Sequence, residues 1–476
     1  MGEPRDRIDD WLSADVEPLA PRPGTFGKIQ QRARRRKMSR AVMSAAGIVV
    51  VIAAAVTVPQ IASTLRSHGP NPGQPVAAGT PPAPAPSTVA GTGGGSPNTR
   101  SSAKVTPPGS ALSAAGSGNP VPANFQPTSV TFVGPNIGAV IGQAGTPGHC
   151  STAYCTSLAG TSDYGINWYG VSAPLSGAPD GSTGVGQLRF LNTTYGWAFG
   201  PQLYATTDGG VTWTRQSTHG MRVTDLETAG NRAFALFATC TGGGAAYGAH
   251  CTAFSLYTSV AGSGQWQPVP GPVSGLEPSQ TASGGASASL VLIGGRGYLL
   301  APSGELLSGP LTGGAWSVAS EQEQCLPGSP GPGGQPTGAL LAADSAKLVL
   351  VCTSATDPAT GTQTKSVIES SDNGKTWTAA QSADVNGIAA SVATQGSSLV
   401  VLATSAGLYL STDGGGTWKL AHASPAGATA GEGGYSYVGM TSATEGVALP
   451  ADADLHEVFI TTDGGRTWKA HAVSRA

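Results

Sequence analysis

Short apolar runs separated by turn residues recur through residues 125–476, as in LVVLA at 399–403 and LYL at 408–410. Runs of this length, bounded by Gly, Asn, Asp or Ser, are typical of strands. They come in groups of four. One group places strands at 187–191, 196–199, 202–206 and 212–216, and the last group places them at 435–440, 445–449, 456–461 and 467–471. The pattern predicts an all-β domain of four-stranded antiparallel sheets.

An eight-residue motif recurs between the third and fourth predicted strands of these groups. Four copies match one another closely, and a fifth has Asn167 where the others have Thr. The copies are TTDGGVTW at 206–213, SSDNGKTW at 370–377, STDGGGTW at 411–418, TTDGGRTW at 461–468 and TSDYGINW at 161–168. This is the Asp-box, also called the BNR repeat. Several near-complete copies in one chain indicate a repeat architecture.

The residue types of the motif suit a hairpin turn. The Asp carboxylate can accept hydrogen bonds from turn N–H groups, and the Gly suits a positive φ. The Trp supplies a large apolar face for packing between sheets. We therefore assign a structural role to Asp163, Gly165, Trp168, Asp208, Gly210, Trp213, Asp372, Gly374, Trp377, Asp413, Gly415, Trp418, Asp463, Gly465 and Trp468.

Two further units, at 257–266 and 308–316, keep only the glycines and the tryptophan of the motif. With them, successive box tryptophans are 45, 53, 50, 61, 41 and 50 residues apart. A four-stranded propeller blade takes about 40–50 residues. The spacing predicts a seven-bladed β-propeller over 125–476. Because two units are degenerate, six or eight blades stay open as alternatives.

An uncharged apolar run at 41–58 is preceded by a basic cluster and ends at Pro59. Its eighteen residues would span about 27 Å as a helix, the low end of what a bilayer needs. The positive-inside rule then predicts a cytoplasmic basic tail at 1–40 and a transmembrane signal anchor at 41–62. A cleaved signal peptide and a buried core helix are the alternatives.

Residues 63–124 consist almost wholly of Pro, Gly, Ala, Ser and Thr. Such a segment lacks the apolar area needed to offset its conformational entropy, so we expect a disordered stalk. It would hold the propeller away from the membrane, on the outer side.

The charge balance of the predicted propeller disfavours nucleic acid as a partner. Residues 125–476 hold twelve Lys and Arg against twenty-one Asp and Glu, a net charge of −9. Nucleic-acid binding requires clustered positive charge. The chain also lacks a phosphate-binding loop and a G-x-S-x-G nucleophile motif. We therefore expect no cofactor.

All six cysteines follow the predicted anchor, and an even number in an extracytoplasmic region indicates disulfides. Sequence order suggests Cys150–Cys155, Cys240–Cys251 and Cys325–Cys352 among fifteen connectivities. Buried free thiols are the alternative. A zinc site is disfavoured, because no C-x-x-C pair or histidine cluster accompanies the cysteines.

The repeats resemble two groups of Asp-box propellers. One is the sialidase type, which includes glycoside hydrolases. The other, which is closer, is the photosystem II assembly factor family of the Ycf48/HCF136 kind, whose blades look like F-x-d-x-x-x-G-W-a-x-G followed by the box. Residues 190–213 follow that pattern through Phe190, Gly196, Trp197 and Gly200. The resemblance covers about residues 125–476 and implies a propeller that binds other proteins or assists assembly.

Three candidate active sites can be named from the sequence. A sialidase needs three converging arginines, which could come only from Arg189, Arg222, Arg232 and Arg296, and the R-I-P signature of that family is absent. The box aspartates recur in every complete copy, whereas an active site is needed once. Asp452, Asp454 and Glu457 could supply oxygen ligands to a loop cation, with a solvated polar loop as the alternative.

These observations predict a non-catalytic interaction or assembly module, anchored in the membrane by one helix and displayed outside it. Its partner would be an envelope protein or glycan. The alternative is an extracytoplasmic glycoside hydrolase or glycan-binding propeller. The discriminating feature is whether the four arginines meet at one end of the central channel. The sequence does not specify an oligomeric state.

Overall fold

The computed structural model describes most of the repeat region. The described residues are 112, 119–134, 136–144, 155–177, 183–241, 250–270, 288–301, 305–319, 336–345, 347–354, 363–426, 428 and 433–474. The tail predicted at 1–40 and the anchor predicted at 41–62 lie outside them, as does most of the stalk predicted at 63–124. Within the described ranges, no helix is both long enough and apolar enough to span a bilayer.

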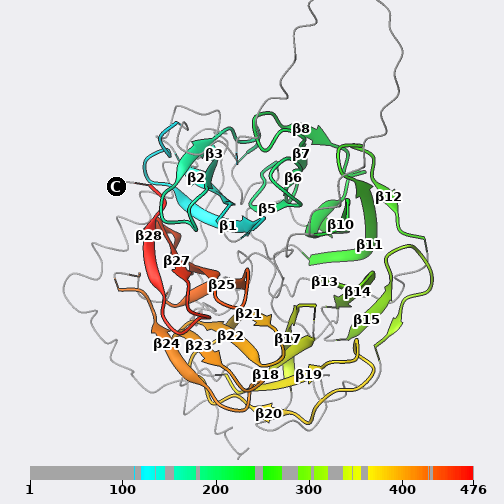
Figure 1. The fold of residues 1–476 in the computed structure, drawn as a ribbon. Helices are drawn as coiled ribbons and strands as arrows, with labels where there is room; N and C mark the ends of the chain where they lie inside the picture. The colour runs from blue at the N-terminus through cyan, green and yellow to red at the C-terminus, as the bar shows by residue number, and fades with distance from the viewer. Residues whose placement is uncertain are drawn as a thin grey trace, which may run out of the picture. The chain divides into compact units, whose positions relative to one another are not determined.

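The described strands form seven four-stranded antiparallel sheets, which are arranged as blades around a common axis (Figure 1). Each blade takes four consecutive strands, from the inner edge outward. Blade 1 is β1 (Gln126–Phe132), β2 (Gly138–Ala144), β3 (Cys155–Thr161) and β4 (Tyr169–Val171); blade 2 is β5 (Gln187–Phe190), β6 (Gly196–Phe199), β7 (Leu203–Thr206) and β8 (Thr214–Gln216). Blade 3 is β9 (Arg222–Ala229), β10 (Arg232–Thr241), β11 (His250–Val260) and β12 (Gln267–Pro268).

The remaining blades repeat this plan. Blade 4 is β13 (Ser289–Ile293), β14 (Arg296–Leu300), β15 (Leu306–Pro310) and β16 (Ser317–Val318); blade 5 is β17 (Pro336–Ala343), β18 (Leu348–Ser354), β19 (Lys365–Ser370) and β20 (Gln381–Ser382). Blade 6 is β21 (Ala389–Gln395), β22 (Leu399–Thr404), β23 (Gly407–Ser411) and β24 (Lys419–Ala423); blade 7 is β25 (Tyr435–Met440), β26 (Gly446–Pro450), β27 (Glu457–Thr461) and β28 (Lys469–Ala472). The prediction of seven four-stranded blades is confirmed.

A separate hydrophobic core fills each of the seven junctions between neighbouring blades. Between blades 1 and 2, for example, Ile141 and Leu158 meet Leu188 and Phe190. Alternation along each strand sends successive side chains to opposite faces of its sheet, so one sheet contributes to two cores. The ring is therefore held by packing between blades, because hydrogen-bonded strand pairing stays within each blade.

Each box tryptophan, including those of the two degenerate units, lies in the core that its blade shares with the preceding blade. They are Trp168 between blades 7 and 1, Trp213 between 1 and 2, Trp266 between 2 and 3, Trp316 between 3 and 4, Trp377 between 4 and 5, Trp418 between 5 and 6, and Trp468 between 6 and 7. One tryptophan per junction explains why the tryptophan spacing alone predicts the blade count.

Blades 7 and 1 close the ring without exchanging a strand, since each is built from consecutive segments of the chain. The Phe125 backbone N–H donates to Ser474 Oγ at 3.1 Å, and its carbonyl oxygen lies 2.9 Å from His456 Nδ1. Phe125 itself is fully buried in the core of this junction. Residues 349 positions apart in sequence are thereby joined.

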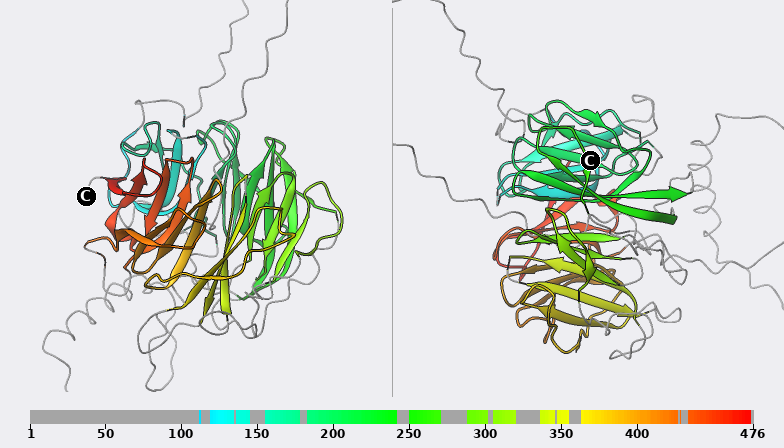
Figure 2. Two further views of the ribbon diagram at one scale, coloured as in Figure 1. Left: turned by 60° about the horizontal axis from the view of Figure 1, so that its bottom comes forward. Right: turned by 90° about the vertical axis from the view of Figure 1, so that its right-hand side faces the viewer.

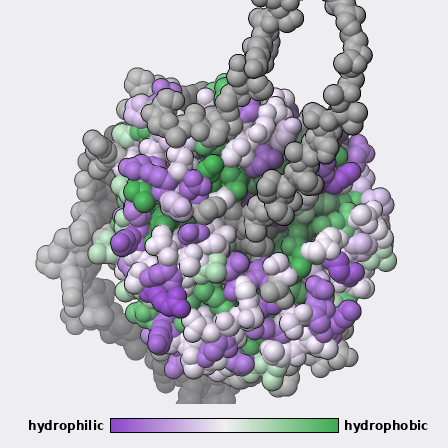
Figure 3. All heavy atoms as spheres, viewed as in Figure 1, coloured by the Kyte–Doolittle hydropathy of each residue, from purple (hydrophilic) through white to green (hydrophobic). Residues whose placement is uncertain are grey.

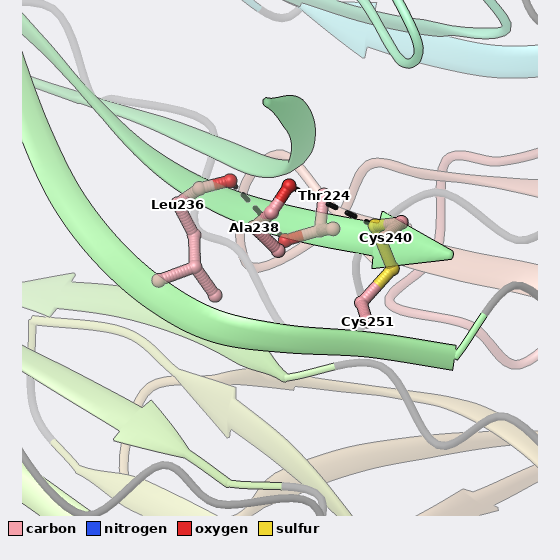
Figure 4. The surroundings of a disulfide bond; sticks show 5 residues. All are labelled: Thr224, Leu236, Ala238, Cys240 and Cys251. Atoms are coloured by element: carbon pink, nitrogen blue, oxygen red, sulfur yellow. Dashed lines mark hydrogen bonds between the residues drawn. A yellow bond between two sulfur atoms is a disulfide. The ribbon is translucent and has the colours of Figure 1, made fainter. Parts of the chain in front are cut away.

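Blade 3 has the longest hairpin of the described chain, and its two green strands reach beyond their neighbours in Figure 2. The inner strand β9 pairs with β10 only as far as Ala238. Beyond that point β10 and β11 continue as a two-stranded extension. A disulfide joins the directly paired residues Cys240 and Cys251 with an S–S distance of 2.06 Å (Figure 4). It cross-links the two strands where no third strand supports them.

Candidate functional site

The box turn is held by its aspartate. In blade 2, Asp208 Oδ1 accepts from the Thr212 backbone N–H at 2.9 Å and from Thr206 Oγ1 at 2.8 Å, and Oδ2 accepts from Thr212 Oγ1 at 2.6 Å. Thr206 Oγ1 in turn accepts from the Gly210 N–H at 2.8 Å. The same bonds recur at Asp372, Asp413 and Asp463. These carboxylates are engaged in the turn.

The box of blade 1 keeps this network despite its different residue. Asn167 Nδ2 donates to Asp163 Oδ2 at 2.7 Å, in the place where threonine hydroxyls donate in the other complete boxes. The Asn167 backbone N–H donates to Asp163 Oδ1 at 2.9 Å. An amide and a hydroxyl can both donate one hydrogen bond here. The substitution therefore preserves the turn.

The box glycine fits the turn closely against the preceding blade. Gly210 has φ of +92°, a conformation that L side chains rarely adopt. A Cβ placed there would also lie 3.1 Å from Val171 Cγ1 of blade 1. Both the backbone conformation and the space available therefore favour glycine.

The pKa is lowered at all five box aspartates, and the effect of hydrogen bonds is clearest at Asp372 and Asp413. The Thr376 hydroxyl and N–H lower the pKa of Asp372 to about 2, and the same groups of Thr417 do so for Asp413. Hydrogen bonds that stabilise the charged form of a carboxyl have this effect. A carboxylate with so low a pKa is a poor proton donor at neutral pH, which disfavours these residues as general acids.

Three inner strands carry a polar side chain that links them to the next blade. In each, the linking residue directly follows a β-bulge. The bonds run from Leu188 N to Ser129 Oγ at 3.2 Å, from Leu290 N to Asp225 Oδ2 at 2.6 Å, and from Val438 N to Ser391 Oγ at 3.1 Å. Inner strands are sheet edges with unpaired backbone groups, and these side chains satisfy some of them.

Asp225 belongs to a buried charged group on blades 2 and 3. Its carboxylate also accepts from the Leu226 N–H at 2.8 Å, and burial raises its pKa well above the usual value of a carboxyl group. Arg189 of β5 donates to Glu227 Oε1 at 3.1 Å and to the Leu226 carbonyl at 3.4 Å. Asp225, Glu227 and Arg189 are 2%, 3% and 8% exposed. These ionisable groups are paired and largely withdrawn from solvent.

Tyr437 occupies the corresponding position after the bulge in β25 of blade 7. Its side chain is 3% exposed and lies in the core that closes the ring. Burial raises the pKa of its phenol, and the charges of Arg189 and Glu227 also act on it, in opposite directions. The linking position is thus used for core packing in this blade.

The four candidate arginines do not converge. Arg222 begins β9, whereas Arg232 pairs with Ala229 at the opposite end of that strand, about 23 Å away. Arg296 lies at the turn between β13 and β14 and donates to Ser308 Oγ at 3.2 Å. Arg189 is paired with Glu227. These four arginines, all of which the structure describes, therefore do not form the cluster that a sialidase requires.

The acidic loop of blade 7 forms a short 3₁₀ turn, η3 (Ala453–Leu455), capped by Asp452. Asp452 Oδ1 accepts from the Asp454 N–H at 3.0 Å, and Asp454 Oδ1 accepts from Gln126 Nε2. Glu457 lies in β27, with its pKa raised by burial. No group of three or more metal-binding side chains occurs in the described part of the chain. Asp452, Asp454 and Glu457 are thus not gathered into one site.

The other predicted cysteine pairs fall largely outside the described residues. Cys150 and Cys325 both lie outside them, and only the backbone of Cys155 is described. Cys352 is disulfide-bonded and 2% exposed.

A buried lysine that carries no sequence signal lies on blade 5. Lys365 is 2% exposed, and its ammonium donates to three backbone carbonyls, of Gln363 at 2.6 Å, Val385 at 3.1 Å and Gly387 at 2.6 Å. Burial lowers its pKa to about 8. Because two of these carbonyls, those of Val385 and Gly387, lie in the segment that leads into blade 6, the lysine helps to fix the connection between the two blades.

The exposed side chains of the boxes differ from blade to blade. Tyr164 and Ile166 of blade 1 and Val211 of blade 2 are 39%, 52% and 43% exposed. The position of Val211 is held by Lys375 in blade 5 and Arg466 in blade 7. Across the face drawn in Figure 3, hydrophobic and hydrophilic residues are interspersed. The repeated turn thus presents different chemistry in each blade.

Comparison with known proteins identifies the repeat. A family model described as BNR/Asp-box repeat matches residues 409–420 and 459–470. No curated protein matches the sequence.

Three solved structures illustrate the structural similarity. YCF48 from Cyanidioschyzon merolae is 13% identical, with a TM-score of 0.39 over 61% of this chain and 85% of that one. A structure described as YCF48 bound to D1 peptide is 17% identical, with a TM-score of 0.44 over 73% and 95%. The GH74 enzyme of Niastella koreensis is 14% identical, with a TM-score of 0.35 over 73% and 65%. The seven four-stranded sheets and the matched repeats show that the described chain is a seven-bladed β-propeller that carries BNR/Asp-box repeats.

Proposed function

We propose that this protein is a non-catalytic interaction module whose propeller binds a partner protein of the cell envelope. The observation that carries the proposal is the display of different exposed side chains on one repeated turn. Tyr164, Ile166, Val211, Lys375 and Arg466 all occupy box turns, which lie on the same side of the ring because each joins the third strand of a blade to the fourth. A rigid scaffold that holds varied side chains on turns is typical of a recognition surface.

The chemistry of the buried groups favours binding over catalysis. A glycosidase needs two carboxyl groups on either side of an open substrate site. Asp225 and Glu227 are instead 2% and 3% exposed, and each is engaged by backbone N–H groups or by Arg189. The box aspartates hold their own turns. Glycan binding or hydrolysis is the alternative function, which the experiment below can detect.

We further propose that the propeller lies outside the membrane, carried by the segment 41–62 and the stalk 63–124. The basic flank of the apolar segment supports this orientation. The disulfide between Cys240 and Cys251 supports it too, because such bonds persist mainly in oxidising compartments. Protease added to intact cells should digest the stalk and spare an epitope tag on residues 1–40. Digestion of the tag but not the stalk would reverse the proposed orientation.

Crosslinking from defined positions in living cells tests the binding function. A photoreactive amino acid replaces Val211 or Lys375 in the full-length chain, and His219 serves as the matched control. His219 is an exposed residue of the connection between blades 2 and 3, on the side of the ring opposite the boxes. We expect the two box positions to capture the same envelope protein and His219 not to capture it. Capture of polysaccharide alone would overturn the proposal and favour the glycan alternative.

A further inference from the structure

One box turn contains a residue that its backbone disfavours. The residue after the aspartate has a positive φ in all five complete boxes, with values of 67° at Tyr164, 71° at Gly209, 64° at Asn373, 75° at Gly414 and 72° at Gly464. Glycine and asparagine adopt this left-handed conformation readily, whereas a bulky side chain does so at a cost. A strained residue of this kind points to a function that the strain serves.

Packing does not account for the tyrosine. Its side chain is 39% exposed, and it does not belong to the hydrophobic core between blades 7 and 1. The one backbone bond at this position, from the Tyr164 N–H to the Asn136 carbonyl at 3.2 Å, is available to any residue other than proline. Glycine would therefore complete the same turn without strain, as it does in blade 2.

The ring of Tyr164 instead lines a surface cavity. The cavity is a shallow depression that opens to solvent where blade 7 meets blade 1, and its volume of about 10 Å³ holds about one water molecule. Its other lining residues are Phe132, Thr441, Glu445, Gly446 and Ile460. Two aromatic rings, one aliphatic side chain and one carboxylate thus surround a single depression. The exposed Ile166 is two residues from Tyr164 in the same turn.

The carboxylate of Glu445 has no cationic partner in the described residues. Its Oε2 accepts from Ser442 Oγ at 2.5 Å. Arg466, in the box of blade 7, donates to the Asp463 carbonyl at 2.6 Å and forms no ion pair with Glu445. The cavity therefore combines a negative charge with apolar walls.

We propose that this cavity binds a lysine or arginine side chain presented by the partner protein. The proposal rests on the interaction function proposed above and assigns a chemistry to one part of the surface. Such a side chain would lie across the mouth of the depression, with its aliphatic stem against the exposed Tyr164 ring and its cation facing that ring and the Glu445 carboxylate. The net charge of −9 over residues 125–476 also favours a basic partner.

Peptide display on the immobilised full-length chain tests the proposal. Random twelve-residue peptides are selected for binding, and a synthetic copy of the enriched sequence is titrated by fluorescence anisotropy. We expect the enriched peptides to share a Lys or Arg, and replacement of that residue by norleucine to weaken binding at least tenfold. Tyr164→Gly and Glu445→Gln should weaken binding of the parent peptide to a similar degree. The matched control His219→Gly, which also removes a side chain at a positive φ (54°) but on the side of the ring opposite the boxes, should leave it unchanged.

Thermal unfolding separates loss of binding from loss of folding. Tyr164→Gly removes the strained conformation, so its melting temperature should equal or exceed that of the parent chain. Three outcomes would each overturn the cavity as the site. They are failure to enrich any peptide, enrichment of peptides without Lys or Arg, and binding to Tyr164→Gly and Glu445→Gln that is as tight as binding to the parent chain. Peptides that bind the parent chain and every variant equally would contradict the cavity proposal but would remain consistent with the proposed protein-binding function. By contrast, capture of polysaccharide alone in cells would overturn the interaction function itself.

Discussion

The complete boxes of blades 1, 2, 5, 6 and 7 differ from the degenerate boxes of blades 3 and 4 in how they hold the same turn. In the complete boxes an aspartate accepts three hydrogen bonds, as Asp208 does. In the degenerate boxes that position is occupied by Ala261 and Leu311. Nevertheless Trp266 and Trp316 are buried, at 5% and 9% exposed. The ring therefore depends on the tryptophan at every junction, whereas the aspartate can be replaced.

Each degenerate box has its own substitute for the aspartate. In blade 3, Ser263 Oγ accepts from the Gln265 N–H at 3.2 Å, as Asp208 does from Thr212. In blade 4, Leu311 is 8% exposed and joins the core with blade 3, while the Gly314 N–H donates to the Pro270 carbonyl at 2.8 Å. A hydroxyl or an apolar contact can thus fix the turn. A polar network and a hydrophobic contact therefore hold the same turn in different blades.

The largest expected effect concerns the buried tryptophan, which complete and degenerate boxes share. Trp316→Ala in a degenerate box and Trp468→Ala in a complete box should each destabilise the propeller by about 3–5 kcal/mol, because each leaves a cavity in a junction core. Unfolding by urea, followed by intrinsic fluorescence and by circular dichroism, measures both. A loss below about 1 kcal/mol for Trp316→Ala alone would show that degenerate blades do not rely on their tryptophan.

The next effect concerns blade 3, where the disulfide cross-links the long hairpin. Replacing both Cys240 and Cys251 by alanine should destabilise the chain by about 2–3 kcal/mol, because the bond closes a loop of 11 residues in the unfolded state. The double variant avoids leaving a free thiol. Its melting temperature is compared with that of the parent chain under oxidising conditions. An unchanged melting temperature would mean that the hairpin extension unfolds independently of the ring.

A smaller effect is expected from the aspartate itself. Asp208→Ala removes the acceptor for the Thr212 N–H and for two hydroxyls at an exposed turn, so it should cost about 1 kcal/mol. Ser263→Ala in the degenerate box of blade 3 is the matched variant and should cost less, because it loses a neutral acceptor. Denaturant midpoints of the two variants give the comparison. Equal losses would contradict a special contribution of the charged carboxylate.

The smallest effect is a dependence of stability on acid pH. The pKa values of Asp372 and Asp413 are lowered to about 2 in the folded chain, from an unfolded value near 4. Their contribution is therefore fully present above pH 4 and is lost as the pH falls toward 2. The double variant Asp372→Asn with Asp413→Asn should show a flatter stability profile between pH 4 and 2. Profiles of equal slope would show that these carboxylates do not govern acid stability.

Much of the blade architecture was predictable from local patterns. The strands expected in blades 2 and 7 agree with the structure to within two residues at each end, for example 202–206 against Leu203–Thr206. Alternation and box turns are both local properties, since each depends on residues that are close in sequence. Even the degenerate blades were found, because Trp266 and Trp316 keep the spacing of their counterparts.

The links between blades were not predictable in the same way. Ser129, Asp225 and Ser391 bond to residues 47 to 65 positions further along, and each depends on a bulge that shifts the strand register. The only sequence feature shared by these three positions is a preceding Thr or Ala at the bulge, and it was recognised only after the structure was known. The four arginines illustrate the same limit, since their separation follows from the direction of β9 and from the Glu227 partner of Arg189.

The sequence by itself determined the repeat and the four-strand order of each unit and favoured seven blades over six or eight, because these follow from alternation, turn chemistry and tryptophan spacing. Only the tertiary structure decided which side chains meet across the closing junction. Tyr164 and Glu445 are brought to one cavity because the ring places blade 1 beside blade 7. Such a meeting depends on the geometry of all seven blades together, and no segment of the sequence encodes it alone.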